Sequence, residues 1–364
     1  MVKNILISGY YGSKNGGDEA ILSSMLDVMR EMDADLKFTV ISLNPKYTKK
    51  RHNVDAVSWL DIFSIIRKII SADLLISGGG SLLQNVTSYS SLYYYLGIIF
   101  LAKIFGCKVM LYAQGIGPIC GCVARKLTKI ILNHVNLITV RDKGSLEELS
   151  RLKISRPKIF CTADPVLALK PAPLELGKKI LSCHSLTKGK EKFIGVAVRR
   201  WANWGNCQNA FAAALDKISA QFNAKIIFLP MHFPADVKAS KSVAALMKNP
   251  CTIIDEELTT KEILSVIGSM DVFISIRLHG LIFAGVMEIP KIGISYDPKI
   301  DRFLDSIGEK PIGTLDDVTA DKIFDAIIKK LSVENNSHLS HKLQAKLREL
   351  AIKNSALALE LVGN

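Results

Sequence analysis

Arginines that follow short apolar runs are the residues best suited to chemistry in this sequence. Arg199 and Arg200 come directly after the run 193–198, and Arg277 comes after the run 272–276. A guanidinium at the end of a strand can bind a carboxylate or a phosphate through two parallel hydrogen bonds. The second half of the chain is therefore expected to bind an anion.

A histidine lies beside one of these arginines. His279 follows Arg277 by two residues, where the next helix is expected to begin. The N-terminus of a helix favours an anion, and an imidazole can give or take a proton near neutral pH. A lone histidine is more often structural, but its position after Arg277 at a strand-to-helix turn favours proton transfer. His232, after the run 225–230, is a weaker candidate.

Glycine-rich loops follow two apolar runs in the first half. They read GYYGSKNGGDE, from residue 9, and SGGGSLLQ, from residue 77. Glycines let a backbone turn tightly and approach a ligand. Asp18 and Glu19 open the helix after the first loop, where they would repel a phosphate but suit sugar hydroxyls. The alternative is that Asp18 only caps that helix.

Two polar residues lie after later apolar runs of the first half. Gln114 is an amide that can bind hydroxyls, and Arg141 follows the run 137–140. Arg141 can instead serve only to pair with Asp142. If the runs are parallel strands, all these residues lie at one edge of the sheet.

Short apolar runs alternate with helical patterns through both halves of the chain. This alternation predicts parallel sheets with helices on both faces. The pattern pauses at residues 169–192, which read as a linker. We expect an α/β protein with two Rossmann-like domains facing a cleft, the glycosyltransferase B architecture. The expected segments are residues 1–172, 173–335 and a C-terminal helix within 336–364, which can pack back on the first domain.

Composition narrows the class of partner. The 364 residues include 47 Lys and Arg against 34 Asp and Glu, a formal charge of +13. Such a surplus favours phosphorylated substrates, nucleic acid or an anionic membrane, although it also fits a generally basic protein. Nucleic acid is disfavoured because no basic run is interleaved with aromatic residues. Nothing in the sequence indicates an oligomeric state.

The seven cysteines include no CxxC pair, so neither a zinc site nor a disulfide framework is expected. Reduced thiols in the cytoplasm are the expectation, and the start MVKNILISGYYG reads as a strand rather than a signal peptide. The apolar segment 92–106 is too short to cross a bilayer and reads as a core helix. Peripheral contact of its exposed part with a membrane remains open.

The motifs occur in the order of a known family. GYYGSKNGGDEAIL, SGGGSLLQ, AQGIGP, VRD, ADP, LPMH, SIRLHGLIFA and ISYDPK resemble the polysaccharide pyruvyl transferases from about residue 4 to residue 303. The sequence is most similar to the branch that acts on secondary cell wall polymers of bacteria with S-layers.

The resemblance implies a pyruvyltransferase that uses phosphoenolpyruvate as its donor, with no cofactor and no metal. It implies that Arg277, Leu278 and His279 bind the donor, that His279 is the acid, and that Arg199 or Arg200 assists. Asp18 or Glu19 is the expected base, and His232 is a further donor contact. The residues expected to bind the acceptor are Tyr11, Asn15, Gly16, Gly79, Gly80, Gln84, Gln114 and Arg141.

The implied acceptor is a β-linked N-acetylmannosamine on a lipid-linked precursor, which would become a 4,6-ketal at the inner face of the membrane. A nucleotide-sugar glycosyltransferase of the same fold is the nearest alternative, with Asp297 or Glu288 binding the nucleotide. A non-catalytic protein that docks on anionic glycan or membrane is the other.

Overall fold

The computed structural model describes residues 2–86, 88–201, 204–332 and 338–363. The chain divides into two compact units, one formed by Met1–Leu169 with Leu347–Asn364 and the other by Lys170–Lys346. Each unit is built around its own parallel sheet. The predicted boundary between residues 335 and 336 lies outside the described residues.

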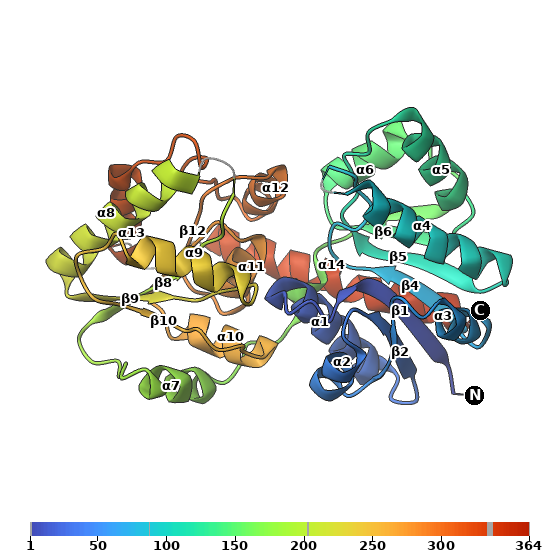
Figure 1. Ribbon diagram of the computed structural model, residues 1–364, viewed down its shortest axis with the longest axis horizontal. Coiled ribbons are helices and arrows are strands. Elements are labelled where there is room, and N and C mark those ends of the chain that lie inside the picture. The colour runs from blue at the N-terminus through green and yellow to red at the C-terminus, as the bar shows by residue number, and fades with distance from the viewer. Residues whose placement is uncertain (1, 87, 202–203, 333–337, 364) are drawn as a thin grey trace. The chain divides into compact units, whose positions relative to one another are not determined.

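The sheet of the first unit has seven parallel strands in the order β3-β2-β1-β4-β5-β6-β7 (Figure 1). The order runs outward in both directions from β1 and β4, so the topological switch point lies between these two strands. The strands are β1 (Asn4–Tyr11), β2 (Lys37–Ser42), β3 (Asp55–Ser58), β4 (Leu74–Gly78), β5 (Lys108–Gln114), β6 (Leu137–Val140) and β7 (Lys158–Cys161).

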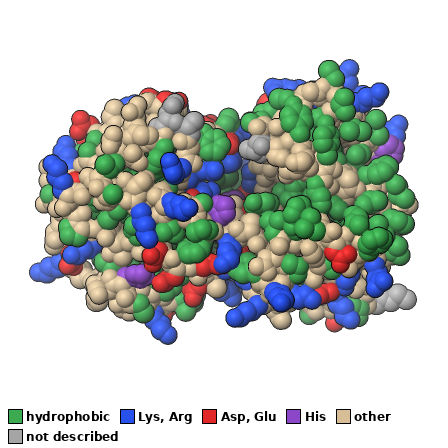
Figure 2. Space-filling view, viewed as in Figure 1, with side chains coloured by type: hydrophobic (Ala, Val, Ile, Leu, Met, Phe, Trp, Pro, Cys, Tyr) green, Lys and Arg blue, Asp and Glu red, His purple; other side chains and the backbone are tan. Residues whose placement is uncertain are grey.

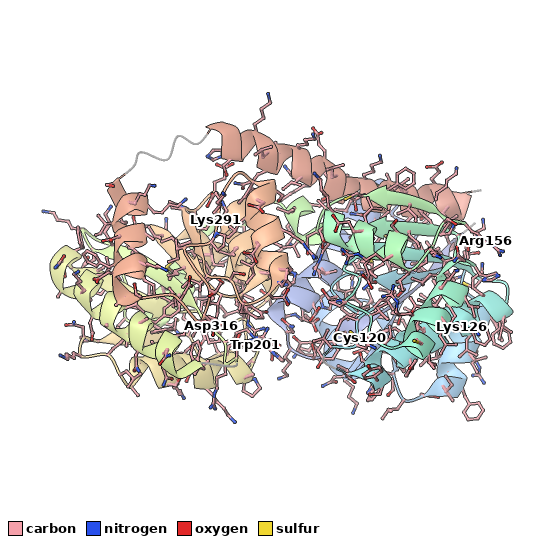
Figure 3. The ribbon with its side chains drawn as sticks, turned by 90° about the horizontal axis from the view of Figure 1, so that it is seen from above. Cys120, Lys126, Arg156, Trp201, Lys291 and Asp316 are labelled. Atoms are coloured by element: carbon pink, nitrogen blue, oxygen red, sulfur yellow. The ribbon has the colours of Figure 1, made fainter. Side chains whose placement is uncertain are left out.

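Helices cover both faces of this sheet because the side chains of its strands alternate between two apolar clusters. Ile5 and Ile7 pack with α1 (Gly16–Met32) and with the C-terminal part of α14 (His338–Gly363). Leu6 packs on the opposite face, which is covered by α3 (Ile62–Ile70), α4 (Tyr89–Ile104), α5 (Cys122–Leu132) and α6 (Lys143–Arg151). Figure 3 shows the C-terminal part of α14 and α4 on opposite sides of the sheet.

Polar contacts fix the C-terminal part of α14 to the first sheet. The hydroxyls of Tyr112 and Ser355 are 2.7 Å apart, and the Thr162 hydroxyl donates to the side-chain Oδ1 of Asn354 over 2.8 Å. Asn354 is fully buried and also donates to the Ala163 carbonyl. The segment Leu347–Asn364 therefore packs as part of the same unit as Met1–Leu169.

The second unit has five parallel strands in the order β10-β9-β8-β11-β12. They are β8 (Lys192–Ala197), β9 (Ala224–Phe228), β10 (Cys251–Ile253), β11 (Val272–Ser275) and β12 (Lys291–Gly293). The helices of this unit are α7 (Leu174–Cys183), α8 (Trp204–Phe222), α9 (Ala235–Ala244), α10 (Thr260–Gly268), α11 (Leu278–Val286), α12 (Pro298–Ser306) and α13 (Ala320–Ser332).

The predicted α/β architecture with two parallel sheets is confirmed. The prediction of a linker at residues 169–192 is wrong, because α7 lies within it and packs on α10. Gly177 of α7 approaches Ser265 so closely that a Cβ would lie 2.3 Å from its carbonyl oxygen. The sequence reading did not assign α6, β7, α12, α13, or the pair α2 (Pro45–His52) and β3.

The segment predicted to be a core helix is α4, whose Leu92, Leu96 and Ile99 are buried in the apolar cluster. Among the described residues, every helix is too short or too polar to span a bilayer.

Candidate functional site

The carboxyl edge of the second sheet brings two of the predicted cations together. β8 and β11 are neighbours with Ala197 opposite Ser275, and Arg199 and Arg277 each follow two residues later. Burial lowers the pKa of Arg199 below its ordinary value, and the nearby positive charge of Arg277 is the next cause. Two partly buried guanidinium groups therefore share one strand edge, while Arg200 points to solvent.

Arg199 contacts two aromatic rings that also pack against each other. Its guanidinium carbon lies 4.8 Å from the ring centre of Trp201 and 4.9 Å from that of Tyr296. Its Nη1 donates to the Tyr296 hydroxyl over 2.6 Å, whereas its buried Nε has no hydrogen-bond partner among the described residues. This stacking fixes the plane of the guanidinium and leaves one buried donor available.

Arg277 is held by a carboxylate that the sequence analysis did not predict. Asp236, in the first turn of α9, is 2% exposed at its side chain and accepts a hydrogen bond from Nη2 of Arg277. Asp236 also accepts from the backbone N–H groups of Met231 (3.2 Å) and His232 (2.9 Å). The buried Nε of Arg277 has no partner among the described residues, so this guanidinium also keeps a donor available.

His279 lies in the first turn of α11, directly after Arg277 and Leu278, and is partly buried. The Ser275 hydroxyl accepts from the Arg277 N–H over 2.9 Å and fixes the turn into the helix. Gly280 is required here, because a Cβ would lie 2.6 Å from the Ser275 Oγ. The edge thus places an acid–base group and a helix N-terminus beside two cations.

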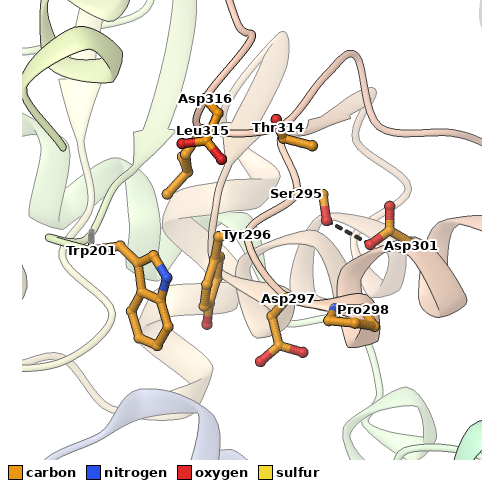
Figure 4. A pocket seen from close by; sticks show the side chains of 9 residues that line it. All are labelled: Trp201, Ser295, Tyr296, Asp297, Pro298, Asp301, Thr314, Leu315 and Asp316. Atoms are coloured by element: carbon orange, nitrogen blue, oxygen red, sulfur yellow. Dashed lines mark hydrogen bonds between the residues drawn. The ribbon is translucent and has the colours of Figure 1, made fainter. Parts of the chain in front are cut away.

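A pocket of about 270 Å³ adjoins this cluster, because Trp201 and Tyr296 form part of its wall (Figure 4). Figure 3 labels Trp201 close to Asp316, another wall residue. The wall also contains the carboxylates of Asp297 and Asp301. Carboxylates repel a phosphate, so an anion is better placed at the arginines than in the pocket itself. No cluster of metal-binding side chains was found in the described part of the chain.

The glycine-rich loops of the first unit pack mainly against the protein itself. A Cβ on Gly79, whose φ is +71°, would lie 2.0 Å from Ile21 of α1. A Cβ on Gly12, whose φ is +79°, would lie 2.3 Å from the Ser42 hydroxyl. A Cβ on Gly80, whose φ is +78°, would lie 3.1 Å from the Asp18 carboxylate. Close packing on α1 and β2 therefore accounts for much of the glycine content.

The two predicted acids differ in their surroundings. Glu19 is 1% exposed at its side chain, accepts from the Gly12 N–H over 2.8 Å and lies 2.7 Å from Nε2 of His52. Asp18 is only partly buried. α1 begins at Gly16, and Asn15 rather than Asp18 is its cap. The geometry favours a structural role for Glu19, and Asp18 is the more exposed of the two carboxylates.

Other predicted acceptor residues hold the loops. Tyr11 is 1% exposed and its hydroxyl donates to the Gly78 carbonyl over 2.6 Å, so this ring is in the core rather than on a binding surface. Gln84 accepts from the Val86 N–H. Arg141 lies 2.8 Å from the Asp164 carboxylate, closer than Asp142 at 3.9 Å.

Arg141 also connects two loops of this edge. Its Nη2 donates to the Ser81 hydroxyl over 2.8 Å, which ties the second glycine-rich loop to the end of β6. The Gln114 amide donates to the Gly80 carbonyl over 3.1 Å, and its Oε1 is buried with no hydrogen-bond partner in the described ranges. The hydroxyls of Ser8 and Ser77, which lie opposite each other on β1 and β4, are also buried with no hydrogen-bond partner among the described residues.

The sequence analysis missed residues that support the cluster rather than those that form its charge. Asp236 is 41 positions from Arg277, and no local pattern links the two. Tyr296 lies within the quoted ISYDPK motif, and Trp201 follows Arg199 by two residues, so both carried a weak signal. His52 lies in α2, a helix that was not predicted.

Solved structures share the fold at low sequence identity. The S. aureus MnaA structure with UDP has a TM-score of 0.66 and 12% identity, over 94% of this chain and 91% of that one. The UDP-GlcNAc 2-epimerase of Methanocaldococcus jannaschii has a TM-score of 0.66 and 14% identity, over 95% and 98%. Anabaena HepE with UDP and glucose has a TM-score of 0.61 and 11% identity, over 99% and 98%.

These similarities establish a fold of the glycosyltransferase B kind. No curated protein matches the sequence. A family model described as polysaccharide pyruvyl transferase matches residues 15–298. This range contains the end of the first glycine-rich loop, the whole second loop, the arginine pair and His279. The chain therefore belongs to the polysaccharide pyruvyl transferase family of enzymes.

Proposed function

We propose that this protein transfers the pyruvyl group of phosphoenolpyruvate to two hydroxyls of a cell-envelope sugar, forming a cyclic ketal and releasing phosphate. The observation that carries the proposal is the pair of partly buried arginines beside His279 at the start of α11. Phosphoenolpyruvate carries a phosphate and a carboxylate, so its recognition requires two cationic contacts.

Arg199 and Arg277 bind these two anionic groups. Both guanidinium groups keep a buried Nε donor, and both are oriented by neighbours, Arg199 by Tyr296 and Arg277 by Asp236. Arg200 is exposed, which favours Arg199 as the donor residue. Leu278 lies between the second arginine and the acid, and His232 follows the neighbouring strand β9.

His279 is the general acid. It gives a proton to C3 of the enol, which becomes a methyl group and leaves an electron-deficient C2. One sugar hydroxyl adds to C2, the C2–O bond to phosphate breaks, and the second hydroxyl adds. Of the two hydroxyl protons, one replaces the proton that His279 gave and the other leaves with phosphate.

The first unit supplies the acceptor site in this proposal. Asp18 is the base, because it is more exposed than Glu19, whose side chain is 1% exposed and held by Gly12 and His52. Asn15, Gly16, Gly79, Gly80, Gln84, Gln114 and Arg141 shape the surrounding edge. We take the sugar to be β-N-acetylmannosamine of a lipid-linked secondary cell wall polymer precursor, which would receive a 4,6-ketal at the inner face of the membrane.

The test incubates the purified protein with phosphoenolpyruvate and a synthetic N-acetylmannosaminyl-N-acetylglucosamine diphospholipid. Phosphate release and product mass are followed. His279→Gln should lower kcat by roughly a hundredfold or more, and Arg277→Lys should mainly raise the KM for phosphoenolpyruvate. Arg200→Lys is the matched control and should change neither.

A folded protein that ignores phosphoenolpyruvate in a binding titration but binds UDP or GDP tightly would exclude the donor assignment. That result would favour a nucleotide-sugar glycosyltransferase. Phosphoenolpyruvate binding without turnover would instead exclude only the chosen acceptor.

A further inference from the structure

The first unit has an apolar surface that plays no part in the proposed chemistry. It lies over α3, α4 and α5, which cover the same face of the sheet and pack side by side. We call it the α3–α5 face and define it by exposed apolar side chains of these helices: Phe63, Ile70, Phe100, Ile104, Val123 and Ile130. In Figure 2, hydrophobic side chains gather on the part of this unit where Figure 1 places α4 and α5.

α4 has apolar side chains on its exposed side as well as on its buried side. Its inner side is buried in the core, while Tyr93, Phe100 and Ile104 form an outer stripe that faces solvent. Phe100 is 52% exposed, and no charged residue interrupts the stripe. The one cation of the helix, Lys103, donates instead to the Asn136 side chain over 2.9 Å. A helix with apolar side chains on both of these sides is normally buried, so its outer stripe calls for a binding partner.

The flanking helices extend this surface. Phe63 of α3 is 83% exposed, and Ile130 of α5 is 49% exposed. The starts of α4 and α5 are close, because a Cβ on Gly121 would lie 3.7 Å from the Tyr89 hydroxyl. Exposed apolar side chains on three adjacent helices make a continuous patch rather than scattered surface residues.

The charge around the α3–α5 face identifies the partner. Between Ile62 and Leu132 the sequence has seven lysines and arginines and one acid, Asp73. Six of the cations lie on α3, α4 and α5, where Lys68 pairs with Asp55 and Arg125 with Glu148, whereas Lys108 of β5 donates to Leu361 of α14. The Asp73 carboxylate already accepts from the Asn4 N–H, and the exposed cations include Arg67, Lys126 and Lys129. Apolar side chains surrounded by cations are complementary to an anionic lipid bilayer. A second copy of the chain would bring the same positive charge.

We propose that the α3–α5 face docks this protein on an anionic membrane, with its apolar side chains in the headgroup region and its cations against the lipid phosphates. This docking also explains how the protein reaches a lipid-linked acceptor, an argument that rests on the proposed function. The loop that ends at Gln84 leads within five residues into α4, so the proposed acceptor edge and the docking surface adjoin in one unit.

The experiment measures co-sedimentation of the protein with phosphatidylcholine vesicles that contain about 30% phosphatidylglycerol. The wild type should bind these vesicles and bind phosphatidylcholine alone much less. Phe63→Ser combined with Phe100→Ser should weaken binding by roughly tenfold or more, because two large apolar groups no longer enter the membrane. Leu176→Ser combined with Leu246→Ser is the matched control. Both leucines are exposed but lie on the second unit, so their replacement should leave vesicle binding unchanged.

A second pair of variants separates charge from apolar burial. Lys126→Gln with Lys129→Gln should weaken binding to the anionic vesicles by roughly tenfold or more. Lys238→Gln with Lys261→Gln removes the same charge from exposed sites of the second unit and should have little effect.

Two results would overturn the proposal. One is a wild type that does not bind anionic vesicles, or that is weakened equally by the control variants. The other is a dimer, measured by light scattering, that separates in Phe63→Ser with Phe100→Ser, because the occupant would then be a second copy. Neither measurement involves turnover, so failure of the proposed reaction would leave this test intact.

Discussion

At the scale of single residues, the candidate donor site depends on how its arginines are oriented. Arg199 packs on two aromatic rings, and Arg277 is fixed by Asp236, which is itself held by two backbone N–H groups. A guanidinium that is already fixed loses little entropy when it binds an anion. The supporting side chains therefore matter to affinity although they need not touch the substrate.

Asp236→Asn should keep the hydrogen bond to Arg277 in part but remove the charge that positions it. We expect the KM for phosphoenolpyruvate to rise roughly tenfold with a smaller change in kcat, since the acid is untouched. Steady-state kinetics with the unfolding midpoint measured alongside provides the check. A tenfold fall of kcat with an unchanged KM would contradict a positioning role.

The two neighbouring acids of α1 should separate stability from activity. Glu19→Ala leaves His52 and the Gly12 N–H buried without their partner, which should cost about 3 kcal/mol of the free energy of unfolding. Asp18→Asn is the control and should cost under about 1 kcal/mol while abolishing most ketal formation. Denaturant titration and the phosphate assay distinguish the two; a stable, inactive Glu19→Ala would contradict this division.

At the scale of elements, the position of a glycine-rich loop can be predicted from the sequence, but the side chains that pack against it cannot. Both loops were predicted to follow β1 and β4, because glycine content and apolar runs are local signals, but β1 runs on to Tyr11, into the first predicted loop. What fills the space beside each glycine was not predictable, because Ile21 and Ser42 come from other elements. Missed elements such as α2 are short and strongly polar, so periodicity identifies them poorly.

Gly79→Ala should be a sensitive test of this packing. The substitution places a Cβ against Ile21 and requires an alanine at a φ of +71°, so we expect a loss of about 2–3 kcal/mol in the free energy of unfolding. Gly97→Ala in α4 has no atom within 4 Å of its Cβ position and should instead stabilise by up to about 1 kcal/mol. Equal effects of the two substitutions in thermal or denaturant unfolding would refute the interpretation.

At the scale of the whole molecule, the alternation of strands and helices predicted two parallel sheets correctly. The C-terminal helix was expected to be able to pack back on the first domain, and Leu347–Asn364 belongs to the first unit. The side chains that hold it there could not be predicted, since partners such as Tyr112 and Ser355 are 243 positions apart. The same limit applied at the carboxyl edge of the second sheet. The cations there were predicted, but the ion pair of Arg277 with Asp236 was not. Local pattern identifies elements, whereas contacts between distant elements have no local signal.

Asn354→Leu should show that the two units are separate in stability. The leucine cannot form the buried hydrogen bonds to Thr162 and Ala163, so we expect the first unit to lose about 2 kcal/mol. Hydrogen exchange followed by mass spectrometry should speed up in β5 and β7 and remain unchanged in β8 and β11. Uniform acceleration in both sheets would contradict independent cores.

The return of the chain into the first unit also sets an order of events during protein synthesis. Tyr112 leaves the ribosome long before Ser355, its partner 243 positions later, has been translated. The segment Lys170–Lys346 lies wholly between them and can fold as soon as it emerges. The unit that begins first is therefore completed after the second one, and until Leu347–Asn364 has emerged it must persist with one face of its sheet lacking this helix.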